Sequence, residues 1–112
     1  MDGTSFNFLK MSIDIKEIAK EHHEIMLEKG FDVSKNNMGQ NLMLIVTELS
    51  EALQAHRKEH FGLEQKDTFE DEIADTLLRI LDLCEAFNID IEKQILWKMK
   101  FNKSRDYKNK NY

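Results

Sequence analysis

Pairs of acidic residues three positions apart are the feature of this sequence with the clearest chemical potential. The pattern recurs as Asp14 with Glu17, Glu21 with Glu24, Glu48 with Glu51, Glu64 with Asp67, Asp67 with Glu70, Glu72 with Asp75, and Asp82 with Glu85. Residues three apart share one face of an α-helix. Carboxylates brought together repel each other and are costly to bury. A hard divalent cation that prefers oxygen ligands, such as Mg²⁺ or Mn²⁺, offsets both costs.

Helical phase separates two of these pairs from the others. Side chains advance by about 100° per residue, so Glu51 lies about 60° to one side of Glu48, and the apolar arc begins about 40° to the other side. Glu72 and Asp75 stand in the same relation to the apolar arc of their own helix. If the two helices pack antiparallel through these arcs, the four carboxylates converge. The sequence thus predicts a site for Mg²⁺, or Mn²⁺, with the ligands Glu48, Glu51, Glu72 and Asp75.

The remaining acidic pairs have simpler explanations. Capping accounts for the pairs at helix starts and loops, and the pair Glu21 and Glu24 passes the phase test but lies in a polar stretch. Asp82 and Glu85 turn away from the apolar arc, so we expect them at the surface. A ferritin-like di-iron site needs Glu-x-x-His, and no histidine here has an acidic residue three positions before it. We therefore expect surface or edge positions for His22, His23, His56 and His60.

A basic stripe near the end of the chain is the second candidate for chemistry. Lys98, Asn102 and Arg105 have the spacing i, i+4 and i+7, so a helix places them on one face. An Arg fork and a Lys point charge with an amide between them can bind a chain of phosphates, although the stripe can also be an ordinary solvated face. Arg79 lies four residues after Asp75, where it can neutralise that carboxylate or contact a phosphate.

The elements that must position these residues are expected to be helices. The 112 residues fit one domain, 1–112, and the absence of Pro together with only four Gly favours long helices. We predict helices at about 14–29, 39–60, 68–87 and 91–105, with 31–38 as a loop and 1–11 packed loosely. No segment alternates with period two, so strands are not expected. Short connections favour an antiparallel four-helix bundle with its core at about 14–105.

Local signals set the expected ends and faces of these helices. Asp14, Asp67 and Asp90 are the expected N-caps, and Gly30 and Asn88 the expected ends of the first and third helices. The expected buried face of the second helix is Leu42, Ile45, Val46, Leu49, Ala52 and Leu53. That of the third is Phe69, Ile73, Leu77, Ile80, Cys84 and Phe87. A core of this size is modest, which makes a site built across a subunit interface plausible.

Charge and composition argue against several classes of protein to which this chain could belong. The net charge of −5 argues against a general nucleic-acid binder, and no stretch approaches the ~20 apolar residues of a membrane span. The start of the chain lacks the pattern of a signal peptide, and the lone Cys84 excludes an internal disulfide, so a cytoplasmic setting is expected. Basic residues dominate from Lys93 onwards, whereas carboxylates dominate the centre. The acidic centre and the basic end can both take part in binding one anionic, metal-bound ligand.

Three segments together resemble the MazG-like nucleoside triphosphate pyrophosphohydrolases. Residues 41–58 (NLMLIVTELSEALQAHRK) are similar to the Glu-x-x-Glu helix of that family, and residues 69–83 (FEDEIADTLLRILDL) to its Glu-x-x-Asp helix. Residues 87–105 (FNIDIEKQILWKMKFNKSR) resemble its last conserved segment. The ordered set covers over half of the chain. Family members often continue with Pro-Tyr-Lys-His-Gly-Lys, whereas here Asp106, Tyr107, Lys108, Asn109 and Lys110 follow.

The resemblance implies an all-α bundle completed by homo-oligomerisation, as a homodimer or homotetramer. It implies Mg²⁺-dependent cleavage of a nucleoside triphosphate to the monophosphate and pyrophosphate, in housecleaning or control of a nucleotide pool. Glu48, Glu51, Glu72 and Asp75 would hold the metal, and Lys98, Asn102 and Arg105 would contact the phosphates. Among the four acids, Glu51 is the candidate to orient or deprotonate the attacking water. The alternative from a different class is a non-catalytic helical regulatory or interaction dimer, whose acidic residues are solvated faces.

Overall fold

The computed structural model describes residues 14–105, and these residues form four α-helices and one short 3-10 helix. Their order is α1 (Ile15–Glu28), η1 (Lys35–Asn37), α2 (Met38–Arg57), α3 (Phe69–Ala86) and α4 (Ile91–Ser104). No strand occurs between residues 14 and 105, so the all-helical prediction is confirmed. The expectations for residues 1–11 and for the tail 106–112 lie outside the described residues.

Side-chain caps fix where the helices begin. The Asp14 carboxylate accepts from the Lys16 N–H at 2.8 Å, and the Asp90 carboxylate accepts from the Lys93 N–H at 3.1 Å, as predicted. The predicted cap of α3 is wrong by one residue, since the Thr68 hydroxyl accepts from the Asp71 N–H at 3.2 Å. Asp67 instead has a φ of 66°, and its own N–H donates to the Asp71 carboxylate. A left-handed residue cannot supply the extended backbone of an N-cap.

The predicted C-terminal signals of α1 and α3 are also found. Gly30 follows α1 with a φ of 89°, a conformation that costs glycine little because it has no Cβ. Asn88 follows α3 with a φ of 55°, in the left-handed region that Asn tolerates better than most residues. Its neighbour Ile89 donates to the Cys84 carbonyl at 2.8 Å, which satisfies one of the last carbonyls of α3. The chain can then turn into α4.

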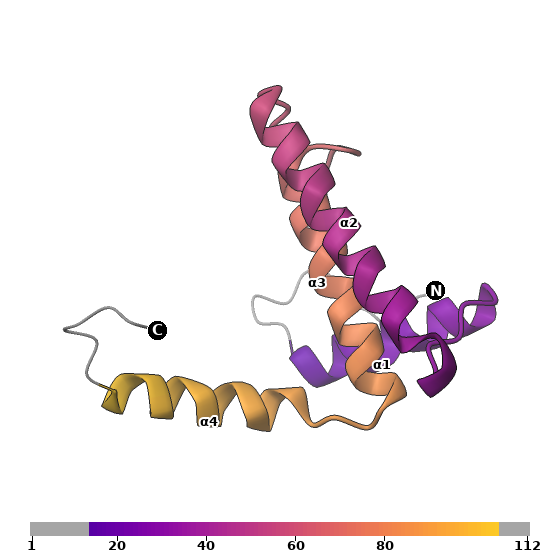
Figure 1. Cartoon of the computed structure of the whole chain (residues 1–112), viewed down its shortest axis with the longest axis vertical. Helices are drawn as coiled ribbons and strands as arrows, with labels where there is room; N and C mark the ends of the chain where they lie inside the picture. Colours follow the sequence, from indigo (N-terminus) through magenta and orange to yellow (C-terminus); the bar gives the residue numbers. More distant parts are fainter. Residues whose placement is uncertain (1–13, 106–112) are drawn as a thin grey trace.

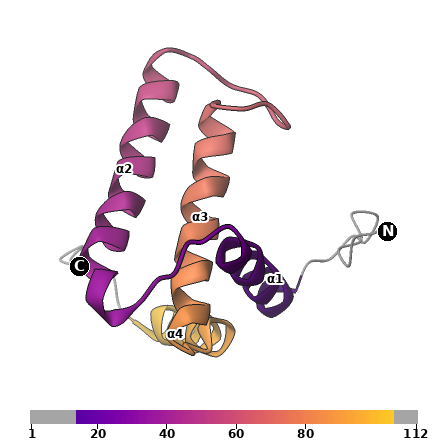
Figure 2. The same cartoon turned by 90° about the vertical axis from the view of Figure 1, so that its right-hand side faces the viewer.

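The helices pack as an antiparallel hairpin with an additional helix on one side. Figure 2 shows α2 on one side of α3 and α1 on the other. From the base of α3, α4 runs away from the hairpin, and its main packing partner is α1 (Figure 1). The predicted antiparallel packing therefore holds for α2 and α3, but one chain does not close a four-helix bundle.

The turn between α2 and α3 sets the register of the two helices. The Thr68 hydroxyl donates to the Gly62 carbonyl at 2.8 Å, and the Gly62 N–H donates to the Glu70 carboxylate at 2.9 Å. The His56 ring meets Phe61 and Phe69 edge to face, with centroids 5.6 and 5.4 Å away. These contacts join the end of α2 to the start of α3. They thereby fix how the acidic residues of one helix lie against those of the other.

The core of the chain is small. Within residues 14–105, the buried apolar side chains are Ala19, Ala52, Ala55, Leu81 and Cys84. The predicted face of α2 is wrong in part, since Leu42, Val46, Leu49 and Leu53 are 49–50% exposed. On α3, Ile73 and Leu77 are also exposed. The reason is geometric, because α2 has α3 as its main neighbour and one helix cannot cover an apolar arc of this width.

None of the described helices combines the length and the apolar character needed to cross a membrane.

Candidate metal centre

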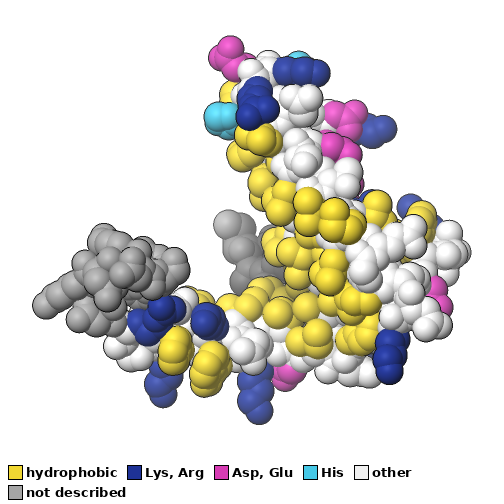
Figure 3. Space-filling model, in the orientation of Figure 1, with side chains coloured by type: hydrophobic (Ala, Val, Ile, Leu, Met, Phe, Trp, Pro, Cys, Tyr) yellow, Lys and Arg dark blue, Asp and Glu magenta, His cyan; other side chains and the backbone are white. Residues whose placement is uncertain are grey.

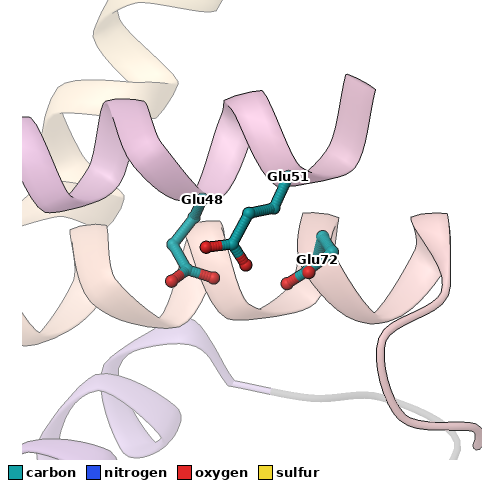
Figure 4. Close-up of side chains that lie close together, drawn as sticks. All are labelled: Glu48, Glu51 and Glu72. Carbon is teal, nitrogen blue, oxygen red and sulfur yellow. The ribbon is translucent and has the colours of Figure 1, made fainter. Parts of the chain in front are cut away.

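Three carboxylates from two helices meet in the space between α2 and α3. Glu48 and Glu51 extend from α2 and Glu72 extends from α3, and their side chains point toward one another (Figure 4). One oxygen of each lies within 4.8 Å of the others. Glu48 and Glu72 are buried, at 8% exposure each, whereas Glu51 is exposed. The convergence that helical phase predicted is therefore present for these three residues.

Asp75 joins the group through Glu48. Burial raises the pKa of Glu48, and a hydrogen bond with Asp75 and the negative charges of Asp75 and Glu51 raise that pKa further. Two carboxyl groups can share a hydrogen bond only when one of them carries a proton. The four acids thus form two pairs across the helices, Glu48 with Asp75 and Glu51 with Glu72.

Glu72 has the largest change in acidity. Burial raises the pKa of Glu72 to about 7, with further contributions from a hydrogen bond with Glu51 and from the negative charges of Glu51, Glu48 and Asp67. A raised pKa favours the protonated form, so Glu72 keeps its proton to a higher pH than an exposed glutamate does. A divalent cation binds deprotonated carboxylates, so its binding would release this proton.

One buried oxygen of the cluster has no donor. Glu48 Oε2 is buried and, among residues 14–105, no N–H or O–H group donates to it. A carboxylate buried without donors is expensive, so such an oxygen needs an explanation. Its neighbour Glu48 Oε1 lies 3.5 Å from Arg79 Nε, which is itself buried without a hydrogen-bond partner. The sequence left two partners open for Arg79, Asp75 and a phosphate; among the carboxylates, the structure places Arg79 against Glu48.

The donor set fits a hard cation. All the candidate ligands are carboxylate oxygens, which suit Mg²⁺, Mn²⁺ and Ca²⁺. Two ligands of one Mg²⁺ lie at most about 4.2 Å apart, because each sits about 2.1 Å from the ion. The separations of up to 4.8 Å between Glu48, Glu51 and Glu72 oxygens thus need only small side-chain adjustments. Mg²⁺ also keeps several waters, so it does not need an all-protein cage.

The predicted phosphate-binding stripe lies elsewhere in the chain. Lys98, Asn102 and Arg105 are on or just beyond α4, which leaves the α2–α3 hairpin at its base (Figure 1). Lys98 Nζ sits 5.0 Å from the centre of the Phe101 ring, and Arg105 Cζ sits 5.6 Å from it. Trp97 stacks on Phe101 at 5.3 Å. A single chain therefore does not bring this stripe to the carboxylates.

A part-buried pair formed by His23 and Asp82 was missed at the level of sequence. His23 Nδ1 lies 2.7 Å from Asp82 Oδ1, and the two side chains are 19% and 9% exposed. The expectation that Asp82 faces the surface is wrong, because α3 is covered by α1 on the side away from α2 (Figure 2). A signal was available, since Ala19, His23 and Met26 form a helical stripe on α1. His56 and His60 are exposed, as predicted.

No family model matches this chain, and no curated protein or solved structure was found to be similar to it.

Proposed function

We propose that the protein is a Mg²⁺-dependent, MazG-like nucleoside triphosphate pyrophosphohydrolase that releases the monophosphate and pyrophosphate. The observation that carries this proposal is the convergence of Glu48, Glu51 and Glu72, with Asp75 paired to Glu48, between two helices. Clustered carboxylates without a matching set of basic partners suit a cation that also binds phosphate oxygens. The resemblance of three ordered segments to the MazG-like family supplies the reaction class.

Burial divides the roles within the cluster. Glu48 and Glu72 are buried, and together with Asp75 they would hold the cation. Glu51 is exposed, so its carboxylate can also reach a water molecule and orient or deprotonate it. Bound Mg²⁺ would lower the pKa of a water ligand and offset charge on the phosphoryl oxygens. The base, the sugar and the number of cations are left open by this set of residues.

The same proposal includes a second copy of the chain. The exposed apolar residues of α2 and α3 form a continuous hydrophobic surface that extends to the base of the hairpin, and α4 carries further apolar side chains between its Lys residues (Figure 3). If a partner subunit packs on this surface, its α4 can approach the carboxylates. Lys98, Asn102 and Arg105 would then bind the phosphates of a substrate held by the cluster of the other subunit.

The deciding experiment is an assay of ribo- and deoxynucleoside triphosphates with Mg²⁺, in which pyrophosphate and orthophosphate are measured separately. The proposal requires pyrophosphate release that depends on the cation. Glu48→Gln, Glu72→Gln and Asp75→Asn should each lower turnover by at least about a hundredfold, because each removes an anionic ligand. Glu24→Gln, on the exposed face of α1, is the matched control and should leave turnover unchanged. Full activity in Glu48→Gln or Asp75→Asn would eliminate the proposed site.

The rival function is a non-catalytic helical module that binds a partner through its apolar faces. The exposed Leu, Ile and aromatic side chains of α2, α3 and α4 favour it as much as they favour an oligomeric enzyme. Cation binding separates the two functions. A true site stabilises the fold by linkage, so Mg²⁺ or Mn²⁺ should raise the melting temperature of the enzyme but not that of such a module.

A further inference from the structure

Arg79 occupies an unusual position beside the carboxylate cluster. Its Nε lies 3.5 Å from Glu48 Oε1, within ion-pairing distance but too long for a good hydrogen bond. Neither Arg79 Nε nor Glu48 Oε2 has a hydrogen-bond partner among the residues that the structure describes, although both atoms are buried. Arg–carboxylate pairs that serve stability are usually bidentate, with two short N–H···O bonds. This pair is therefore an electrostatic contact without the directional bonds that normally hold it.

The charges around Glu48 explain why an imperfect contact persists. Asp75 and Glu51 are negative and act on Glu48 from α3 and α2, and Arg79 is the positive group that opposes them. Arg79 lies one helical turn after Asp75 on α3, so helical phase places its side chain on the same face of α3 as Glu72 and Asp75. A cation placed among the carboxylates would share Glu48 with Arg79.

We propose that Arg79 is the resident counter-charge of the cation-free cluster and that it competes with a divalent cation for Glu48. The inference rests on the cation site of the proposed function. Without a cation, Arg79 offsets part of the repulsion among the four acids and so stabilises the hairpin. With a cation bound, the same positive charge repels the ion and weakens its binding. Arg79 is thus a positioning residue that sets the affinity for the cation.

The test is direct binding of Mn²⁺, followed by calorimetry or electron paramagnetic resonance, to the full-length chain at pH 8. Arg79→Met keeps the length of the side chain and removes the charge, whereas Arg79→Lys keeps the charge. One unit charge about 6 Å from a divalent ion changes its affinity about tenfold, even at the dielectric constant of water. We therefore expect Arg79→Met to bind Mn²⁺ about tenfold more tightly than wild type, and Arg79→Lys to stay near wild type.

A second readout follows from the same charge balance. Cation-free Arg79→Met should melt at a lower temperature than wild type, and its rise in melting temperature on adding Mn²⁺ should be larger. Arg57→Met, at the exposed end of α2, removes the same net charge and should change neither quantity. If Arg79→Met does not fold, Arg79→Gln is the second neutral variant and should bind Mn²⁺ more tightly than Arg79→Lys.

The outcomes separate this inference from the proposed function. Unchanged or weaker Mn²⁺ binding in the folded neutral variants, with wild type binding normally, would overturn the role of Arg79 and leave the cation site intact. Wild-type protein that binds no Mn²⁺ would instead overturn the cation site and, with it, the proposed function.

Discussion

Glu72 couples the acidity of the cluster to the stability of the protein. Its pKa is about 7 in the folded chain against 4.5 without burial and neighbours, so between these pH values the folded state binds more protons than the unfolded state. The free energy of unfolding therefore falls as pH rises through this window. We predict that cation-free wild-type protein is less stable at pH 8 than at pH 5, and that Glu72→Gln reduces this loss because the amide does not ionise.

Urea unfolding in EDTA at a series of pH values measures this effect. Glu48 also has a raised pKa, so the variant should retain part of the wild-type decline rather than none of it. Glu24→Gln is again a suitable control, and its curve should parallel that of wild type. If wild type and Glu72→Gln lose stability equally between pH 5 and 8, then Glu72 does not titrate in this window.

At the residue scale, sequence pattern predicted the acids better than it predicted their partners. Helical phase selected Glu48, Glu51, Glu72 and Asp75, because the direction of a side chain around a helix follows from its position in the sequence. The polar surroundings of Glu21 and Glu24 were needed to set that pair aside. The partner of Arg79 could not be obtained in this way. It depends on the axial register of α2 against α3, which the turn at Gly62 and Thr68 fixes. Asp75, one helical turn away, was the nearer choice along the sequence, but Glu48 is the contact in space.

α1 buries a single residue, which makes its polar contact with α3 important. That residue is Ala19, and the His23–Asp82 pair is a close polar contact between the two helices. His23→Leu would leave the Asp82 carboxylate buried without its donor. We predict a loss of about 1–3 kcal/mol in the free energy of unfolding. Hydrogen exchange should show the lost protection concentrated in α1, since local stability follows local contacts.

The matched control for this prediction is an exposed ion pair of the same helix. Lys16 Nζ lies 3.7 Å from Asp90 Oδ2, with the lysine side chain 56% exposed. Such pairs contribute little, so Lys16→Ala should cost less than about 1 kcal/mol. The double variant His23→Leu with Asp82→Leu should recover part of the loss, because it removes the unpaired carboxylate. If His23→Leu costs no more than Lys16→Ala, the pair does not hold α1 on α3.

At the element scale, caps could be predicted because their signals are local. Asp14 and Asp90 need only the backbone N–H groups two or three residues ahead. Burial could not be predicted in the same way, since it depends on how many neighbours a helix has. α3 has neighbours on two sides, which buries Asp82, whereas α2 has one main neighbour, which leaves Leu49 half exposed. A model in which each helix buries one apolar arc therefore fails for α3, which is covered on two sides, and for α2, whose arc is only partly covered.

The apolar surface of the hairpin gives a prediction for the whole molecule. Leu49 and Leu53 project from α2 at about half exposure, and a symmetric interface through this face would use each of them twice. Burying a leucine contributes roughly 1.5 kcal/mol or more, so Leu49→Glu in both copies should weaken a dimer at least about a hundredfold. Sedimentation and light scattering should then show monomers that keep the helical circular dichroism of wild type.

The matched control for Leu49→Glu is a substitution of another exposed leucine, outside the proposed interface. Leu63 lies in the turn between α2 and α3 at 77% exposure, outside the helical face, so Leu63→Glu should leave the oligomer unchanged. A wild-type chain that stays monomeric at high concentration would contradict the predicted oligomer.

The sequence indicated a site shared between subunits only through the small size of the chain and the family resemblance. Side-chain exposure now adds a specific surface, which the sequence had assigned to the core of one chain.

The last prediction concerns how two copies share the chemistry. If α4 of one subunit serves the carboxylates of the other, a subunit with Glu48→Gln and a subunit with Lys98→Ala and Arg105→Ala are each inactive alone. A mixed dimer, however, contains one site with intact acids and an intact basic stripe. Half of the dimers in an equal, fully exchanged mixture are mixed, so pyrophosphate release should recover to about a quarter of the wild-type rate. If α4 acted only within its own chain, every site in the mixture would carry a defect, and mixing would recover nothing. The single chain places α4 away from the hairpin (Figure 1), which is why we expect recovery.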